Sequence, residues 1–476
     1  MSARLLSIVL LLTASMTFAA EKPNVLFIAV DDLNDWISCM GGHPQCKTPN
    51  IDRLAARGML FTNAHCAAPA CNPSRASLLT GIRPSTSGVY VNPQPWRKAL
   101  PNAVTLPQHF TANGYWVGGS GKMFHGAFAD PQSWQVYYPS LKKQTPPGFS
   151  PKAKPLNGMP NTAHFDWGPI KATDEQMSDA KVAGWVCEQL KQDFDKPFFL
   201  ACGMFRPHLP WYAPEKYFDQ HPLDDIVLPD HLGSDLDDIP PAGKKMAKPD
   251  GDHRRVQKAK QWKHAVRGYL ASIAFMDAQI GRVLDALDES KHADNTIIVF
   301  WTDHGWHLGE KQHWRKFALW EEATRTPLMF VVPKNLATKL PTGVQRASRC
   351  SQPVGLIDIY PTLIDLCGLS QNERLEGESL LSQLQDPTAK RDRPALTTHG
   401  RNNHALRTER FRYIRYENGD EELYDHQADP MEYTNLAADL QYAKVKNDLA
   451  KWFPTTNVEP SPRAKPKKKR NKKKAK

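Results

Sequence analysis

The chain lacks the features of several common protein classes. After residues 5–12 it has no long hydrophobic run, so no later segment is apolar enough to span a membrane. Eight cysteines among 476 residues are too few for a disulfide framework, and spacing does not decide whether Cys39 and Cys46 pair. No internal repeat is visible, so a repeat architecture is not indicated. This length predicts one large α/β domain and a smaller one.

Most of the chain also lacks excess charge, although the net charge is +11. Ten of the 61 lysines and arginines lie in residues 461–476, which contain no acid, and the remaining charges nearly balance. A nucleic-acid-binding domain is therefore not indicated. We expect residues 457–476 to form a disordered basic tail. The tail is either simply solvated or an arm that binds acidic polysaccharide or a membrane surface.

Residues 1–20 have the pattern of a secretory signal peptide. Arg4 precedes the apolar run 5–12, and the small residues at 17–19 resemble a cleavage site. No cysteine follows that could carry a bacterial lipid anchor. We expect an exported soluble protein, either periplasmic or extracellular.

Two apolar runs end in candidate metal ligands. Residues 24–30 read as a buried central strand that leads to Asp31 and Asp32, and residues 295–300 read as a second strand that leads to Asp303 and His304. Open α/β sheets build their sites at the carboxyl ends of strands. Carboxylates this close repel one another unless a cation or proton lies between them. A solvated acidic turn remains an alternative for Asp31 and Asp32 taken alone.

Cys71 precedes Pro73, Ser74 and Arg75 at the predicted start of a helix. The proline fixes φ, and free backbone N–H groups at a helix start suit anionic chemistry. A single cysteine before a helix is most often an ordinary buried residue. The stretch alone therefore leaves both interpretations open.

Cationic and titratable side chains follow two further predicted strands. Lys122 and His125 come after the strand at 115–118, and His208 lies between prolines after the strand at 197–203. Lys316 lies in another segment. Converging acids indicate a metal, and converging lysine, arginine and histidine indicate an oxyanion substrate.

These motifs together resemble the type I, formylglycine-dependent sulfatases. The family signature is C-x-P-S-R followed by L-L-T-G, which matches residues 71–81, and residues 48–55 (T-P-N-I-D-R-L-A) are also sulfatase-like. The string G-K-M-F-H-G at 121–126, Trp96-Arg97 and His304 are most similar to the iduronate-2-sulfatase branch. The resemblance runs from Asn24 to about Trp452.

The resemblance implies an alkaline-phosphatase/sulfatase-like α/β fold. We expect a large, mixed, mostly parallel sheet flanked by helices in a catalytic domain at 21–400. A small C-terminal α+β subdomain with an antiparallel sheet should follow at 401–456. Within it, residues 411–416 and 422–425 predict a hairpin around Asn418-Gly419, and residues 436–452 predict a helix.

The resemblance also implies the chemistry of a sulfuric ester hydrolase. A formylglycine-generating enzyme would oxidise Cys71 to an aldehyde, whose hydrate attacks sulfur. One Ca²⁺ would be held by Asp31, Asp32, Cys71, Asp303 and His304, although His304 is an unusual ligand for a cation that prefers oxygen.

The remaining site residues receive roles by the same resemblance. Lys122, Lys316 and Arg75 would offset charge on the transferring group or hold the nucleophile. His208, with Lys316, would protonate the leaving oxygen. His125 would deprotonate the second hydroxyl of the hydrate, which expels sulfate.

The expected substrate is a sulfated sugar or polysaccharide, such as a sulfated uronic acid. Arg97, Arg206, Trp306 and Lys311 are candidates to contact a carboxylate or a sugar face. Two alternatives remain: a phosphomonoester or phosphonate ester hydrolase of the same superfamily, or a secreted, non-catalytic glycan-binding protein. The sequence leaves exo or endo action and the oligomeric state open.

Overall fold

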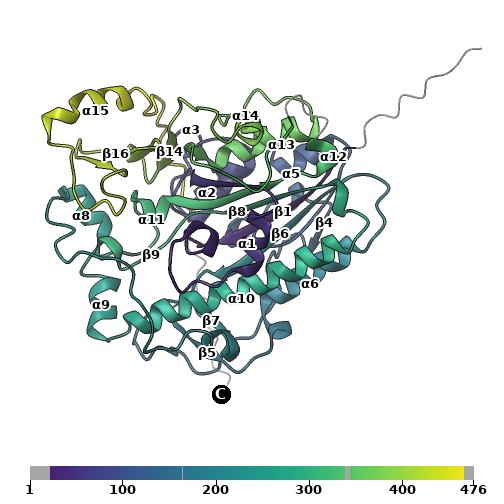
Figure 1. Cartoon of the computed structure of the whole chain (residues 1–476), viewed down its shortest axis with the longest axis horizontal. Helices are drawn as coiled ribbons and strands as arrows, with labels where there is room; N and C mark the ends of the chain where they lie inside the picture. The colour runs from purple at the N-terminus through teal and green to yellow at the C-terminus, as the bar shows by residue number, and fades with distance from the viewer. Residues whose placement is uncertain (1–21, 163, 338–342, 466–476) are drawn as a thin grey trace, which may run out of the picture.

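The computed structural model describes residues 22–162, 164–337 and 343–465, and a nine-stranded sheet lies at its centre (Figure 1). The strands are β1 (Asn24–Asp31), β2 (Met59–His65), β3 (Trp116–Gly121), β4 (Val136–Tyr138), β6 (Phe198–Pro207), β8 (Thr296–Thr302), β11 (Arg325–Val331), β12 (Ser348–Cys350) and β13 (Val354–Gly355). Their order is β12-β2-β11-β8-β1-β6-β3-β4, with β13 also paired to β2. Within this sheet β11 runs antiparallel to both neighbours, and the other pairs are parallel. The predicted mostly parallel sheet is confirmed.

The uninterrupted apolar sequence of β1 follows from burial on both faces of the sheet. Val25, Phe27 and Ala29 belong to one hydrophobic cluster, whereas Leu26 and its alternate neighbours belong to the other. Successive side chains of a strand point to opposite faces, so a strand covered on both sides has no polar face to show.

Helices cover both faces of the sheet (Figure 1). One layer holds α1 (Pro49–Ala55), α6 (Ser178–Leu190) and α10 (Trp262–Asp288). The other holds α2 (Cys71–Thr80), α5 (Leu106–Ala112), α13 (Ile359–Cys367) and α14 (Leu381–Gln385). In α10, an apolar stripe that includes Leu270, Ile273 and Leu284 is buried against the sheet. Each such side chain contributes about 1.5–3 kcal/mol by leaving water.

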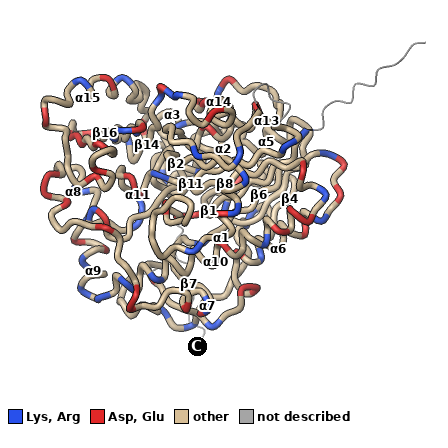
Figure 2. Tube along the Cα trace, viewed as in Figure 1, with Lys and Arg blue, Asp and Glu red and all other residues tan. Residues whose placement is uncertain are grey.

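Shorter elements lie around these layers. The helices are α3 (Pro84–Ser87), α4 (Trp96–Ala99), α7 (Glu215–Phe218), α8 (Pro241–Ala247), α9 (Asp252–Lys258), α11 (Glu321–Thr324) and α12 (Lys334–Ala337). Two small two-stranded sheets pair β5 (Trp167–Ile170) with β7 (Trp211–Pro214) and β9 (His307–Leu308) with β10 (Trp314–Arg315). Basic and acidic residues are interspersed along the trace in the view of Figure 2. None of the helices in the described part has the length and apolarity that crossing a bilayer requires.

The C-terminal part forms the predicted antiparallel sheet. Its strands are β14 (Ala395–Thr398), β15 (His404–Arg407), β16 (Phe411–Arg415) and β17 (Glu421–Asp425), in that order. The hairpin at Asn418-Gly419 is present, with Gly419 at φ 88°. Two boundaries differ from expectation: the sheet begins before residue 401, and the helix expected over 436–452 is the shorter α15 (Ala443–Ala450).

The chain beyond residue 456 also differs from expectation. Residues 457–464 lie along the loop after α3 instead of leaving the surface. Backbone N–H groups of Val458, Ser461 and Ala464 donate to carbonyls of the 85–93 segment at 2.7–2.9 Å. The predicted signal peptide at 1–20 and the lysine-rich residues 466–476 fall outside the described chain. All eight cysteines, Cys39 and Cys46 included, are free thiols.

A buried ionic cluster joins the C-terminal sheet to the large domain. Arg412 of β16 is 1% exposed; its Nε donates to Glu432 at 2.5 Å, and its Nη2 donates to Glu321 of α11. Arg407 of β15 also donates to Glu321, at 3.2 Å, and His426 lies 2.9 Å from Glu432. The cluster leaves no charge without an opposite partner.

We predict that Arg412→Met lowers the free energy of unfolding by about 3–5 kcal/mol, because it leaves two buried carboxylates without their main partner. Chemical denaturation followed by circular dichroism measures the change. Arg410→Met is the matched control, because the Arg410–Asp425 pair lies at the surface and is worth less than about 1 kcal/mol. Equal losses in the two variants would contradict this account of the cluster.

Candidate active site

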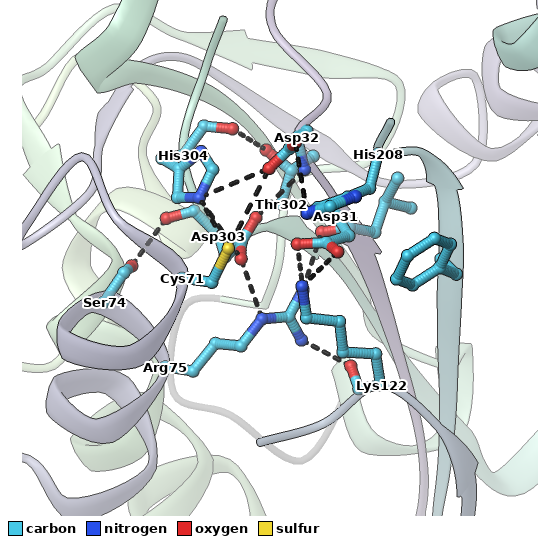
Figure 3. A network of polar contacts seen from close by, with 12 residues as sticks. Asp31, Asp32, Cys71, Ser74, Arg75, Lys122, His208, Thr302, Asp303 and His304 are labelled. Atoms are coloured by element: carbon cyan, nitrogen blue, oxygen red, sulfur yellow. Dashed lines mark hydrogen bonds and ion pairs between the residues drawn. The ribbon is translucent and has the colours of Figure 1, made fainter. Parts of the chain in front are cut away.

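Four adjacent parallel strands bring their carboxyl ends to one place. The strands β8, β1, β6 and β3 are neighbours in the sheet, and each is followed by a predicted site residue. These are Asp303 after β8, Asp32 after β1, His208 after β6 and Lys122 after β3. Figure 3 shows their side chains around Cys71. The predicted convergence is confirmed.

Cys71 is the first residue of α2, as the sequence predicts, and is 1% exposed. Its Sγ lies 3.1 Å from Lys316 Nζ, 3.4 Å from His304 Nε2 and 4.0 Å from Asp32 Oδ1. Burial raises the pKa of the Cys71 thiol to about 12, even though Lys122 and Lys316 lower it. The unmodified thiol is therefore protonated at neutral pH and is a poor nucleophile.

Three fully buried carboxylates surround the sulfur. Asp31, Asp32 and Asp303 are each 0% exposed. Ligand atoms of Asp31, Asp303, Cys71 and His304 lie within 4.8 Å of one another. Asp32 Oδ2 is buried without a hydrogen-bond partner, and burial, followed by the charges of Asp31 and Asp303, raises the pKa of Asp32 to about 7 even though Lys316 lowers it. An unpartnered carboxylate oxygen among converging acids fits a divalent cation.

The backbone at Asp32 allows both acids to face the same point. Asp32 has φ 62°, in the left-handed region that non-glycine residues rarely occupy, so the chain turns where β1 ends. Its N–H donates to Asp303 Oδ1 at 3.1 Å, and its carbonyl accepts from the Tyr269 hydroxyl at 2.7 Å. These bonds hold the strained turn.

Buried cations balance the carboxylates. Lys316 Nζ donates to Asp32 Oδ1 at 2.5 Å, and Lys122 Nζ donates to Asp31. Burial lowers the pKa of each lysine, but the neighbouring acids outweigh burial and raise it. Both lysines are therefore charged.

Arg75 has a different environment from the one expected. Its Nε donates to Asp303 Oδ2 at 2.8 Å and its Nη2 to Asp31 Oδ1 at 3.4 Å. The remaining donors contact the backbone carbonyls of Val30, Lys122 and Met123. Every donor is engaged within the protein, so Arg75 positions the two carboxylates and has no hydrogen left for a substrate.

The histidines of the site are neutral in this arrangement. Burial, followed by Lys122, lowers the pKa of His125 to about 4, and its Nδ1 has no partner. Burial also lowers the pKa of His208. His208 Nδ1 lies 2.6 Å from the Leu209 carbonyl, to which it donates, so Nε2 is the unprotonated nitrogen; it lies 3.7 Å from Asp32 Oδ2. Both imidazoles are therefore available as proton acceptors.

Several residues that support the site were not predicted. Ser74 Oγ donates to the Asp303 carbonyl at 2.5 Å, and Asn34 Nδ2 donates to the Trp306 carbonyl at 3.1 Å. The Asp179 carboxylate accepts from the N–H groups of Phe205 and Arg206, which fixes the segment before His208. Ser74 lies inside the C-x-P-S-R signature, but no local pattern distinguishes Tyr269 or Asp179 from other helix residues.

The four residues expected to contact the sugar are engaged elsewhere. Arg97 pairs with Asp130 at 2.7 Å and lies over Trp96. Lys311 is 2% exposed and pairs with Asp235 at 2.6 Å. Arg206 donates to the carbonyls of its own loop, and Trp306 is buried with Lys316 Nζ 5.3 Å from its ring. Arg97 and Lys311 are therefore paired with carboxylates and Trp306 is buried, whereas Arg206 is held by backbone carbonyls without a carboxylate partner in the described chain.

Comparison with known proteins agrees with this geometry. A model of the sulfatase family matches residues 23–369. The chain belongs to the sulfatase family. A second model, for the C-terminal region of N-sulphoglucosamine sulphohydrolase, matches residues 309–458. The first match contains all the predicted site residues, and the second contains the C-terminal sheet.

Named sulfatases match over most of the chain. A sulfatase of Formosa agariphila is 41% identical over 458 residues, which covers 92% of this chain and 87% of that protein. Iduronate 2-sulfatase of Mus musculus is 32% identical over 423 residues, covering 77% of this chain and 74% of its own length.

Two solved structures are similar to this sulfatase in fold. One, in complex with its substrate D-glucosamine-2-N,6-O-disulfate, has a TM-score of 0.72 at 21% identity and covers 90% of this chain and 96% of its own. The other, phosphonate monoester hydrolase of Agrobacterium radiobacter, has a TM-score of 0.71 at 25% identity and covers 90% of this chain and 94% of its own.

We predict that the sulfatase is stabilised by a divalent cation, because a cation relieves the repulsion among the three carboxylates. Calcium at 100 times its dissociation constant should add about 2.7 kcal/mol to the free energy of unfolding, and a chelator should remove it. Differential scanning calorimetry measures the shift without reference to activity. Asp303→Asn should abolish the calcium response. If that response persists, the cation binds elsewhere, for instance at Glu321, His426 and Glu432.

Proposed function

We propose that this sulfatase removes sulfate from an acidic sugar or polysaccharide, with Cys71 in the form of formylglycine. The observation that carries the proposal is the gathering of Cys71, three carboxylates and two charged lysines at one point. The raised pKa of the Cys71 thiol supports a modified side chain, because the thiol itself is not activated. Similarity to an iduronate 2-sulfatase supports a sulfated sugar as the substrate.

The residues present fit one Ca²⁺ held by Asp31, Asp32, Asp303, His304 and the converted Cys71. Bound there, calcium would lower the pKa of a hydroxyl on residue 71, and formylglycine would supply two such hydroxyls as its hydrate. Because these ligand atoms include a histidine nitrogen as well as oxygens, metal analysis of the purified protein should test for zinc as well as calcium.

The lysines neutralise the substrate. Lys316 Nζ lies 3.1 Å from Cys71 Sγ, and Lys122 Nζ contacts Asp31 on the other side of the site. Charged ammonium groups at these positions attract the sulfate oxygens and stabilise the charge that develops on them. Arg75 acts by holding Asp31 and Asp303 in place.

The histidines move protons. Neutral His125 accepts the proton of the second hydroxyl on residue 71, which lets sulfate leave. His208 takes a proton as the anionic substrate enters and, with Lys316, transfers it to the leaving sugar oxygen. The balance of the cycle is one water consumed for one alcohol and one sulfate released.

We also propose that a formylglycine-generating enzyme acts on Cys71 and that the protein works outside the cytoplasm, in the periplasm or beyond. The basis for export is the amino-acid pattern of residues 1–20. A second candidate function, phosphonate or phosphate monoester hydrolysis, is favoured by the similarity to phosphonate monoester hydrolase.

We predict that Cys71→Ala lowers sulfate ester hydrolysis at least about a thousandfold while the fold persists, because the variant has no nucleophile. Sulfate release from aryl and sugar sulfates measures the loss, and circular dichroism checks the fold. Parallel assays with the phosphate monoester of the same phenol test the second candidate. Faster turnover of the phosphate ester would reassign the reaction. As a further check, mass spectrometry should find the peptide of residue 71 about 18 Da lighter than with cysteine.

We predict that His208→Ala lowers kcat on a sugar sulfate by about 10²–10⁴-fold and lowers it less on an aryl sulfate. A sugar alcohol needs a proton to leave, whereas a phenol leaves as its anion. Steady-state kinetics with the two esters give the comparison. His164→Ala is the control, because its ring lies 6.3 Å from the His208 ring without contact with the acids. A uniform loss on both esters would argue against proton transfer by His208.

A further inference from the structure

A cavity of about 550 Å³ lies between α8 and the C-terminal sheet, beside the catalytic centre. We propose that it is a subsite for the sugar that adjoins the sulfated one and that it selects a neighbour carrying a carboxylate or a second sulfate. The inference rests on the proposed function, because it concerns the rest of the same substrate. Its volume lies in the range of small-molecule sites.

The Phe317 ring adjoins both this cavity and the Lys316 ammonium group of the catalytic centre. Lys316 Nζ, 3.1 Å from Cys71 Sγ, lies 5.8 Å from the centre of the Phe317 ring. The Phe317 ring lies 6.0 Å from that of His399, and both residues line the cavity. The proposal places the sugar next to the one held at Cys71 against the Phe317 ring, on which its apolar face can pack.

The walls are fixed to the catalytic residues. His313 spans the gap between α8 and the Lys316 segment: its Nδ1 lies 2.7 Å from the Ala247 carbonyl and its Nε2 2.8 Å from the Lys316 carbonyl. The N–H of Phe317 donates to the Pro69 carbonyl at 3.1 Å, two residues before Cys71. The end of α8 and the Phe317 ring are thus held at a set position relative to the sulfur.

Unpaired positive charge lies on the α8 side of the cavity. Lys245 and Lys248 both line it and are exposed, and within the described chain neither forms an ion pair with a carboxylate. Glu417, exposed on the opposite hairpin, is the one acid among the lining residues. His399 adds a neutral imidazole whose buried Nδ1 has no partner. Two free ammonium groups beside an aromatic wall suit an anionic sugar.

A second, larger cavity has more acidic than basic residues in its lining. It has a volume of about 610 Å³ and is lined by Asp35, Asp230, Glu310, Glu322 and Glu409, among others. Arg325 and Arg407 also line it, but each pairs with a carboxylate, Asp35 and Glu321 respectively, so neither is free to bind a polyanionic chain. Of these two cavities, only the one with the α8 lysines complements an acidic polysaccharide.

The test compares a sulfated monosaccharide with a glycosaminoglycan disaccharide that has the same sulfated sugar and a carboxylate on its neighbour. We expect K245Q/K248Q to lower the ratio of kcat/KM for the disaccharide to kcat/KM for the monosaccharide about tenfold, mainly through KM. K244Q is the matched control: Lys244 lies on the same helix, does not line the cavity and donates to the Asp237 carbonyl. It should leave the ratio unchanged.

Two outcomes would overturn the subsite. One is a ratio that K245Q/K248Q does not change, and the other is an equal fall in K244Q, which would indicate general attraction by surface charge. Calorimetric titration of the disaccharide into Cys71→Ala, with and without K245Q/K248Q, provides a readout that needs no turnover, and the double change should weaken binding about tenfold. If wild-type protein cleaves no sulfate ester, the proposed function fails, and the titration still decides whether the cavity binds an anionic sugar.

Discussion

The structure depends on three carboxylates that are buried together at the carboxyl ends of the central strands β1 and β8. Taking Asp31, Asp32 and Asp303 out of water costs several kcal/mol for each charge, and their mutual repulsion adds to the cost. Arg75, Lys122 and Lys316 offset that cost by direct contacts. Among the oxygens of these three carboxylates, Asp32 Oδ2 alone has no hydrogen-bond partner, and it identifies where a cation would complete the balance. Because charged groups of both signs are concentrated here, the site is suited to the transfer of an anionic group.

The C-terminal sheet contributes to this arrangement from a distance. Arg412 of β16 contacts Glu321 and donates to the Leu319 carbonyl at 3.0 Å, three residues beyond Lys316. His313 joins the same segment to α8. The segment that carries Lys316 is therefore held by both the subdomain and the α8 region, which are also the two walls of the proposed subsite. The Lys316 segment and the proposed subsite are thus held in place by the same contacts.

Much of the fold and of the site could be predicted because local patterns carried the information. The apolar run of β1 indicated that both faces of this strand are buried. The polar residues that follow β1, β3, β6 and β8 indicated that the carboxyl ends of these strands lie close together. Predictions that needed knowledge of distant partners were less successful. Lys311 reads as a free cation in sequence but pairs with Asp235, and residues 457–464 read as tail but bond to the 85–93 segment.

The amino-acid sequence by itself determined the strands, the position of Cys71 at a helix start and the set of charged residues that follow the strands. Periodicity, proline placement and the family signature are local properties, so they can be recognised in the sequence without knowledge of the fold. Only the tertiary structure decided which of those charges are satisfied within the protein and which are free. Arg75 and Lys311 are satisfied, whereas Asp32 Oδ2 has no hydrogen-bond partner and Lys245 and Lys248 form no ion pair within the described chain. Pairing depends on distances in space between segments that lie tens to hundreds of residues apart in the sequence, and composition does not encode those distances.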